Sequence, residues 1–327
     1  DGFNFQGDKN GSKWSTLVRE IPRAIETGLC DLRPDSQAVQ ITHDAAGNAD
    51  AVLYLDADGN MHRQAAKAVC VAGNSIESPR LLLLSASSMF PDGLANSSGQ
   101  VGRNYMRHLT GSVYARFDKP VHMYRGETMA GIIADEQPHD PSRGFVGGYY
   151  METLALGPSF LASFVDPGAW GADFTEIMDA YSHTAGMWIV GEDMPQESNR
   201  VTLSDTKRDK WDLPAANVHY DDHKNDLAMR THAYEKATQL YASVGSLGSQ
   251  LTPPYPSTHN LGTVRMSADP KDGVLNSWGQ SHDVKNLFVS DGSVMTTGAS
   301  ANPTLTIVAL AIRQAEYLAK QLKSGEL

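Results

Sequence analysis

One segment constrains the fold of this chain more than any other, because it joins three elements in a fixed order between residues 287 and 322. Residues 287–289 form an apolar run that is long enough for one buried strand. The turn residues Asp291-Gly292-Ser293 end that strand. Beyond them, apolar side chains recur at helical spacing: Leu305, Val308, Ala309, Ile312, Ala315, Ala319 and Leu322. The segment therefore predicts a buried strand, a polar turn and a long amphipathic helix.

The start of that helix is a candidate ligand site. Asn302-Pro303 predicts the first turn, with Asn302 as the N-cap and Pro303 at the first helical position. A helix N-terminus carries free N–H groups and a positive dipole end, which suit an anionic or electron-rich ligand. His259 precedes the unit on a loop rich in Pro, Thr and Gly. By residue type alone, His259 fits a structural or solvated histidine, and Asn302 fits a simple cap.

Taken together, these motifs resemble a known family. The segment His259-Asn260-Leu261-Gly262-Thr263, followed by Asn302-Pro303-Thr304, resembles the C-terminal signature of the GMC (glucose–methanol–choline) flavoprotein oxidoreductases. It is most similar to the sugar-oxidising branch, which includes pyranose oxidases, C-glycoside 3-oxidases, and gluconate and glucoside 3-dehydrogenase catalytic subunits. The resemblance implies an FAD-dependent oxidoreductase. It also implies that His259 is the catalytic base and that Asn302 orients the same substrate oxygen.

The resemblance further implies a set of FAD-binding residues. Asp291 and Gly292 lie where the family binds the ribityl and pyrophosphate part of FAD, and Pro303 and Thr304 stand at the helix start beside the flavin ring. Residues 69–72, a glycine turn and a leucine-rich helix resemble the segment beside the adenosine, with Gly73 at the turn. Gly73 lacks a Cβ, so its backbone can approach a ligand closely. An ordinary glycine turn is the alternative. Ala38, on an earlier strand, is the match for a backbone contact to adenine.

The dinucleotide-binding loop of such an enzyme is not found in this sequence. A Gly-x-Gly-x-x-Gly turn after a strand holds the FAD pyrophosphate in the family, and no glycines here have that spacing. The sequence begins at Asp1 rather than at Met. We therefore expect the N-terminal FAD-binding segment to belong to a longer form of the protein or to a separate chain.

Composition narrows the remaining choices. A chain of 327 residues with 41% hydrophobic residues can bury a large core and predicts two domains. The net charge of −11 argues against a nucleic-acid surface. No apolar run reaches about 18 residues, so no transmembrane helix is expected. Two cysteines give neither a disulfide framework nor a zinc pattern.

The predicted fold class is α/β (α+β), GMC/PHBH-like, with a partial FAD-binding Rossmann-like domain and a mostly antiparallel sheet in the substrate domain. The predicted boundaries are 1–108 for the remainder of the FAD-binding domain, 109–257 for the substrate domain, and 258–327 for the catalytic loop and the return to the FAD-binding domain. Apolar and β-branched runs predict strands at 36–42, 51–55, about 62–71, 111–117 and 186–190, and a surface helix at 226–244.

Several residues admit two interpretations. Tyr149, Tyr150, Trp170 and Phe174 fit either sugar stacking or an aromatic core. His108 ends a segment, residues 101–108, that resembles the family's exit from the FAD-binding domain, and we interpret it as structural rather than catalytic. His219 and His223 have ligand-like spacing, but a solvated loop before a helix is the favoured interpretation, and no metal site is predicted.

The predicted function is FAD-dependent oxidation of a secondary alcohol of a sugar or glycoside, with C3 of a glucoside favoured. An oxidase that uses oxygen and a catalytically silent, FAD-free subunit are the alternatives. A periplasmic sugar-binding module is a weaker third alternative. Related dehydrogenases work with a small helper subunit and a cytochrome, so these are the expected protein partners. The sequence leaves the periplasm and the cytoplasm of a bacterium open as locations.

Overall fold

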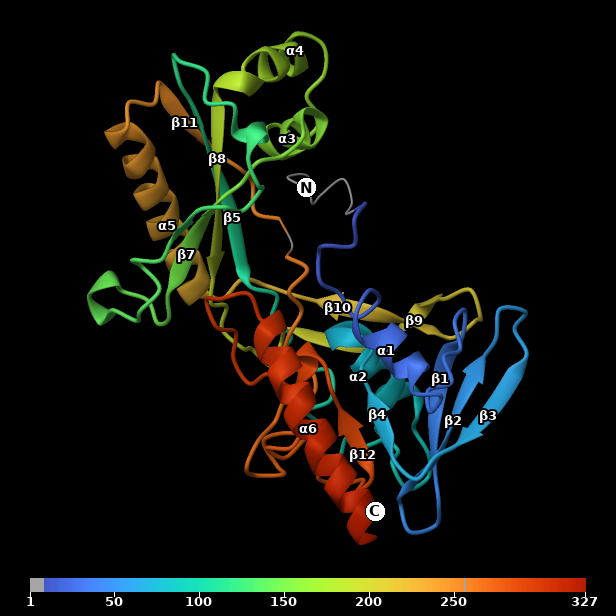
Figure 1. Cartoon of the computed structure of the whole chain (residues 1–327). Coiled ribbons are helices and arrows are strands. Elements are labelled where there is room, and N and C mark those ends of the chain that lie inside the picture. Colours follow the sequence, from blue (N-terminus) through green and yellow to red (C-terminus); the bar gives the residue numbers. More distant parts are fainter. Residues whose placement is uncertain (1–8, 256) are drawn as a thin grey trace. The chain divides into compact units, whose positions relative to one another are not determined.

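The computed structural model describes residues 9–255 and 257–327. The chain folds into two compact units (Figure 1). Unit 1 comprises the described parts of residues 1–34, 109–191 and 225–256, and unit 2 comprises residues 35–108, 192–224 and 257–327. The chain therefore passes between the units several times. The predicted domain boundaries stay a prediction, and they differ from these two units in the grouping of residues 1–34 and 192–224.

Unit 1 is built on one antiparallel sheet. Its strand order is β11-β5-β8-β7-β6, and β5 and β8 pair along their whole length, from Leu109↔Gly191 to Arg116↔Thr184. The elements are α1 (Glu20–Glu26), β5 (Leu109–Arg116), β6 (Ile132–Ile133), β7 (Tyr149–Thr153), α3 (Pro158–Val165), α4 (Ala172–Asp179), β8 (Thr184–Gly191), α5 (Lys224–Ser243) and β11 (Gly248–Leu251). A mostly antiparallel sheet was predicted for this part of the chain, and the structure confirms it.

The helix α5 covers one face of this sheet. Met229, Ala233 and Ala237 recur every four residues, and all three are buried in a cluster with residues of β5, β7 and β8. The predicted helix at residues 226–244 is therefore present, although the description as a surface helix misses its packed face. Of the aromatic residues with two interpretations, Tyr149 and Tyr150 are buried in the sheet, and Trp170 is 85% exposed.

Unit 2 combines two kinds of sheet. One is the antiparallel meander β1-β2-β3, and another is the parallel pair β12-β4. The elements are β1 (Gln37–His43), β2 (Ala49–Leu55), β3 (Met61–Ala65), β4 (Val69–Val71), α2 (Asn74–Leu84), β9 (Arg200–Arg208), β10 (Pro214–His219), β12 (Leu287–Val289), the 3₁₀ turn η5 (Gly292–Val294) and α6 (Thr304–Ser324).

The prediction of a single strand over about 62–71 is wrong, because the chain changes sheets there. β3 pairs antiparallel with β2, whereas β4 pairs parallel with β12. The side chain of Asn286 fixes the crossing, since its amide donates to the carbonyl oxygens of Ala49 and Lys67 at 2.7 and 2.8 Å. A run of strand-forming residues cannot reveal such a change of partner.

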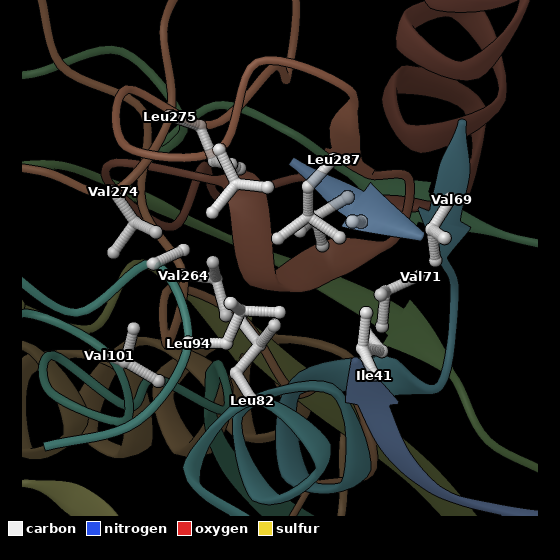
Figure 2. Close-up of a cluster of buried hydrophobic side chains, with 14 of the residues drawn as sticks. Ile41, Val69, Val71, Leu82, Leu94, Val101, Val264, Val274, Leu275 and Leu287 are labelled. Atoms are coloured by element: carbon white, nitrogen blue, oxygen red, sulfur yellow. The ribbon is translucent and has the colours of Figure 1, made fainter. Parts of the chain in front are cut away.

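The core of unit 2 lies between the parallel pair and α2. Figure 2 shows Val71 of β4, Leu287 of β12, Leu82 of α2 and Ile41 of β1 converging in one cluster of buried apolar side chains. Each of these four side chains is at most 5% exposed. The cluster fixes the two parallel strands and the helix that follows β4, and so positions the ends of both strands.

The last helix, α6, packs by one side only. Gln314 is its one buried residue among those described, and its amide donates to the carbonyl oxygen of Val289 in β12 at 2.7 Å. Figure 1 shows α6 beside β12. On the opposite side of the helix, Leu305 is 82% exposed and Ile312 58%. The predicted N-cap is wrong by one residue: Pro303 precedes the helix and already has a helical conformation. Within the described residues, no helix has both the length and the apolar character needed to cross a membrane.

Candidate active site

Asp291 ties together the carboxyl ends of the two parallel strands. One oxygen, Oδ2, accepts from the Asn74 backbone N–H at 3.0 Å and from the Ser78 hydroxyl at 2.5 Å. The other, Oδ1, accepts from the backbone N–H and the hydroxyl of Ser293 at 2.8 and 2.5 Å. With four donors on a buried carboxylate, this side chain is committed to holding the turn after β12 against the turn after β4.

The turn after β4 is exposed at the head of α2. The backbone N–H of Gly73 donates to the Ser78 hydroxyl at 2.9 Å. Asn74 has a left-handed backbone, with φ of 72°, and its Oδ1 accepts from the N–H groups of Ile76 and Glu77 at 2.8 and 3.3 Å. Asn74 therefore caps α2, a role that the sequence analysis did not assign. Ala38 lies on a different element, β1, where it is exposed beside an irregularity in the β1–β2 pairing.

The loop that carries His259 packs directly on the turn after β12. A Cβ on Gly292 would lie 2.6 Å from the carbonyl oxygen of Asn260, so only glycine permits this approach. The same carbonyl accepts from the Ser75 hydroxyl at 2.8 Å, and Gly262 N–H donates to the Gly292 carbonyl at 3.1 Å. The structure thus brings the predicted residues Gly292 and Asp291 next to the loop of His259.

His259 lies against a second histidine, His108. Their Nδ1 atoms are 3.2 Å apart, and the rings meet edge to face with centroids 5.2 Å apart. Burial lowers the pKa of His259 below its ordinary value. Burial, and secondly the neighbouring His259, lower the pKa of His108 to about 4, while the Ala299 backbone opposes this change. Both rings are therefore neutral at neutral pH.

His108 is held in place by its backbone. It has a left-handed φ of 59°, and Asp193 accepts from the N–H groups of Arg107 and His108 at 2.6 and 3.2 Å. Gly298 packs closely here, since a Cβ on it would lie 3.0 Å from Asp193 Oδ1 and 3.5 Å from His108 Cδ2. The segment that leads to α6 therefore passes beside the histidine pair.

The neighbour of His259 is also fixed. Asn260 Oδ1 accepts from the Tyr105 hydroxyl at 2.5 Å, and burial raises the pKa of Tyr105. Sequence reasoning missed Tyr105 and Asp193 as positioning groups. Tyr105 stands in the same Val-Gly-Arg-Asn segment as His108, which was a usable signal, but nothing local marks Asp193.

Asn302, Pro303 and Thr304 stand at the start of α6. Pro303 is buried, whereas Asn302 and Thr304 are exposed. The Pro303 carbonyl accepts the first helical bond, from Ile307 N–H at 3.0 Å. The N–H groups of the first helical turn, Thr304 among them, lack acceptors within the helix and can bind an electron-rich group.

Three other features of the described residues were candidates for a site: the histidines near residue 219, metal-ligating clusters and the cavity of unit 1. His219 Nε2 lies 3.1 Å from the Asp221 carboxylate, and no group of three or more metal-ligating side chains occurs in residues 9–255 and 257–327. Unit 1 contains a cavity of about 690 Å³, whose walls include Tyr114, Leu161 and Gln250 but none of the predicted site residues.

These residues fit part of a dinucleotide cofactor. The ends of two parallel strands meet at Asp291, an exposed turn opens α2, and the free N–H groups of α6 follow the segment beside His108. Carboxyl ends of parallel strands and helix N-termini are where dinucleotides bind. The sequence does not supply the glycine-rich pyrophosphate turn of such a site.

Comparison with known proteins places the chain in a family. Two models of the GMC oxidoreductase family match it, one over residues 1–110 and the other over residues 195–311. The chain is 36% identical to the 2-methyl-1,2-propanediol dehydrogenase of Mycolicibacterium austroafricanum, over 98% of the chain and 60% of that protein. It is 29% identical to the fructose dehydrogenase large subunit of Gluconobacter japonicus, over 89% of the chain and 54% of that protein. It is 30% identical to the C-glycoside 3-oxidase of Arthrobacter globiformis, over 97% of the chain and 59% of that protein.

The fold agrees with these matches. The structure of formate oxidase from Aspergillus oryzae superposes with a TM-score of 0.68 at 14% identity, over 88% of this chain and 60% of that one. The chain thus spans little more than half the length of each relative. The order of motifs, the parallel strand pair and both family models agree: the chain belongs to the GMC oxidoreductase family, a family of FAD-dependent oxidoreductases.

Proposed function

We propose that this chain carries the acid–base part of an FAD-dependent enzyme that oxidises a secondary alcohol of a sugar or glycoside, C3 of a glucoside being the favoured position. The observation that carries the proposal is the neutral His259, held beside His108 and packed on the Asp291–Gly292 turn. A neutral imidazole at this place can accept a proton near neutral pH.

The chemistry requires two transfers. Oxidation of the alcohol to a ketone moves the hydroxyl proton to a base and the carbon-bound hydrogen, as hydride, to an acceptor. FAD, when bound, supplies the hydride acceptor. His259 takes the hydroxyl proton, at Nε2, because Nδ1 contacts His108. The Asn302 amide orients the same oxygen and does not titrate, so one group of the pair carries the pH dependence.

The proposed cofactor-binding residues fall into groups that contact different parts of FAD. Ala38 and Gly73 are proposed to lie beside the adenosine, and Asp291 and Gly292 beside the ribityl and pyrophosphate groups. The Asp291 carboxylate already accepts from four donors. A ligand at this turn would therefore bind to the backbone and not to the carboxylate. Pro303 sets the start of α6, and the Thr304 N–H would donate to an electron-rich atom of the flavin ring.

A further FAD-binding segment, in a longer form of the protein or in another chain, is proposed to complete the parallel sheet. β4 pairs with β12 alone among the strands described, and Cys70 at its centre is exposed. Parallel sheets are normally covered on both faces and have more than two strands. The exposed stripe of α6, formed by Leu305 and Ile312 seven residues apart, has the spacing of a packing face. An added parallel strand with its helix would cover both features.

Two alternatives keep specific support. The diol dehydrogenase at 36% identity favours a small vicinal diol as a second candidate substrate. A helper subunit and a cytochrome are proposed as electron-accepting partners, because one relative is itself named a large subunit. Oxygen as the acceptor stays open, since a relative is named an oxidase.

The test combines flavin content and turnover. Full-length protein is assayed with glucosides, fructose, gluconate and 1,2-diols, using an artificial acceptor and separately oxygen. His259→Ala is expected to lower kcat by about 100-fold or more, and His219→Ala, an exposed histidine away from the pair, serves as the matched control. Activity of His259→Ala within a few-fold of wild type would contradict the assignment of His259 as the base. Full-length protein without flavin absorbance would favour the silent-subunit alternative.

A further inference from the structure

We propose that His108 is a positioning residue that fixes the tautomer of His259, keeping the proton of His259 on Nδ1 and its lone pair on Nε2. The proposal rests on the proposed role of His259 as the base. It changes the interpretation of His108 from a structural histidine to a group that determines whether its neighbour can act as a base.

The starting point is the contact between the two Nδ1 atoms at 3.2 Å. A neutral imidazole has one N–H and one bare nitrogen. Two bare nitrogens would repel each other at this distance, and two N–H groups would clash. One ring therefore donates and the other accepts, which leaves two arrangements.

The two arrangements have opposite consequences. If His259 donates through Nδ1–H, its Nε2 carries the lone pair that a base needs. If His108 donates instead, the proton of His259 sits on Nε2, and that nitrogen cannot accept another. His259 can therefore act as a base in only one of the two arrangements, and the surroundings of His108 determine which one forms.

Those surroundings favour the first arrangement. With Nδ1 of His108 facing His259, Nε2 is its other polar atom, and this atom is buried without a hydrogen bond of ordinary geometry among the described residues. The Ala299 backbone nevertheless raises the pKa of His108, which is the effect that a carbonyl acceptor has on a ring N–H. A proton on Nε2 of His108 leaves its Nδ1 bare, and His259 then donates to it.

His108 also has little freedom to turn away. Its left-handed backbone is held by Asp193, and Gly298 packs against that carboxylate, where a Cβ would lie 3.0 Å from Oδ1. Burial keeps the ring neutral, with a pKa of about 4, so it acts as a lone-pair acceptor and not as a cation beside the base. When His259 takes up the hydroxyl proton at Nε2, its Nδ1–H still donates to His108. No proton moves between the rings.

The test reads the tautomer directly, by nitrogen NMR of protein with ¹⁵N-labelled histidine rings, without substrate. His259→Ala identifies the His259 signals among the 11 histidines. His108→Asn keeps an acceptor, because Asn Oδ1 stands where His Nδ1 stands, and Asn tolerates a left-handed backbone. His108→Leu keeps much of the volume and removes the acceptor. Thermal unfolding of each variant shows whether it is folded.

We expect His259 to be protonated at Nδ1 in wild type and in His108→Asn. In His108→Leu we expect protonation at Nε2, with a fall in kcat of about 100-fold or more and little change in KM. His108→Asn should recover most of that loss. An Nε2-protonated His259 in wild type, or an unchanged tautomer in folded His108→Leu, overturns the proposal. If His108→Leu does not fold, loss of the Nδ1–H tautomer in His108→Asn overturns it. If the tautomers behave as expected but His259→Ala remains active, the proposed function fails and the pairing stands.

Discussion

Replacing Asp291 by alanine removes the acceptor at which the ends of β4 and β12 meet. Four donors lose their partner: two hydroxyl groups, of Ser78 and Ser293, and two backbone N–H groups, of Asn74 and Ser293. The hydroxyl groups can rotate toward other acceptors, but the backbone N–H groups cannot. The Ser293 N–H is buried and the Asn74 N–H partly so.

The magnitude follows from these two N–H groups. A hydrogen bond to a charged acceptor contributes about 1.5–3 kcal/mol, and a buried donor left without a partner costs about 1–3 kcal/mol. Loss of both backbone bonds therefore predicts a decrease of about 3 kcal/mol in the free energy of unfolding. Because the same carboxylate joins the turns that carry Gly73 and Gly292, we also expect weaker flavin retention.

Denaturant unfolding followed by circular dichroism measures the first effect, and the flavin-to-protein absorbance ratio after gel filtration measures the second. Asp44→Ala is the matched control. Asp44 accepts backbone N–H bonds from Ala46 and Asn48 at 2.9 Å in a turn of the same unit, but in an exposed position. We expect a much smaller loss for it. If both variants lose the same free energy of unfolding, the buried position of Asp291 adds no stability over an exposed turn, and the reasoning is refuted.

Three further outcomes are expected. The pKa of His108 is about 4 in the folded state against 6.5 in the unfolded state. The stability that the neutral ring contributes above pH 6.5 is therefore lost as the pH falls, by about 3 kcal/mol at pH 4. Unfolding at several pH values should show a smaller loss in His108→Asn than in wild type, and a loss remains in the variant because burial also lowers the pKa of His259. Because burial lowers the pKa of His259, kcat/KM should fall on the acid side with a midpoint below 6.5, and a midpoint above 6.5 would contradict the assignment. Polar substitution of the stripe, Leu305→Ser with Ile312→Ser, should reduce flavin content in full-length protein, whereas Glu235→Ser, at an exposed position of α5 in unit 1, should not.

The sequence predicts the strand–turn–helix units well because each is a local pattern. The apolar run at residues 287–289, the turn at Asp291 and the helix from Thr304 were all predicted close to their observed places. The change of sheet between β3 and β4 was missed, since it depends on the side chain of Asn286, some 220 residues away in the chain. Strand propensity describes one residue and its neighbours, whereas sheet membership is decided by distant partners.

The candidate site shows the same limit more sharply. His259 was found because a motif surrounds it, yet its contact with His108 joins residues 151 positions apart. His108 was interpreted as structural, because a lone histidine in a sequence carries no information about its neighbours. Asp193 had no signal at all, since its role is to hold two backbone N–H groups of a distant segment. Tertiary contacts of this kind are invisible to any pattern within one segment.

The interactions within unit 2 separate the acid–base groups from the surface on which a further FAD-binding segment is proposed to pack. His108 and His259 are positioned by Asp193 and by the Tyr105–Asn260 hydrogen bond, none of which involves the open edge of β4 or the stripe of α6. The histidine pair should therefore form whether or not that surface is covered. It follows that the two stripe substitutions, Leu305→Ser and Ile312→Ser, should lower flavin content yet leave the His259 tautomer unchanged. A tautomer that shifts in the stripe variant would mean that the covering segment itself helps to set the base.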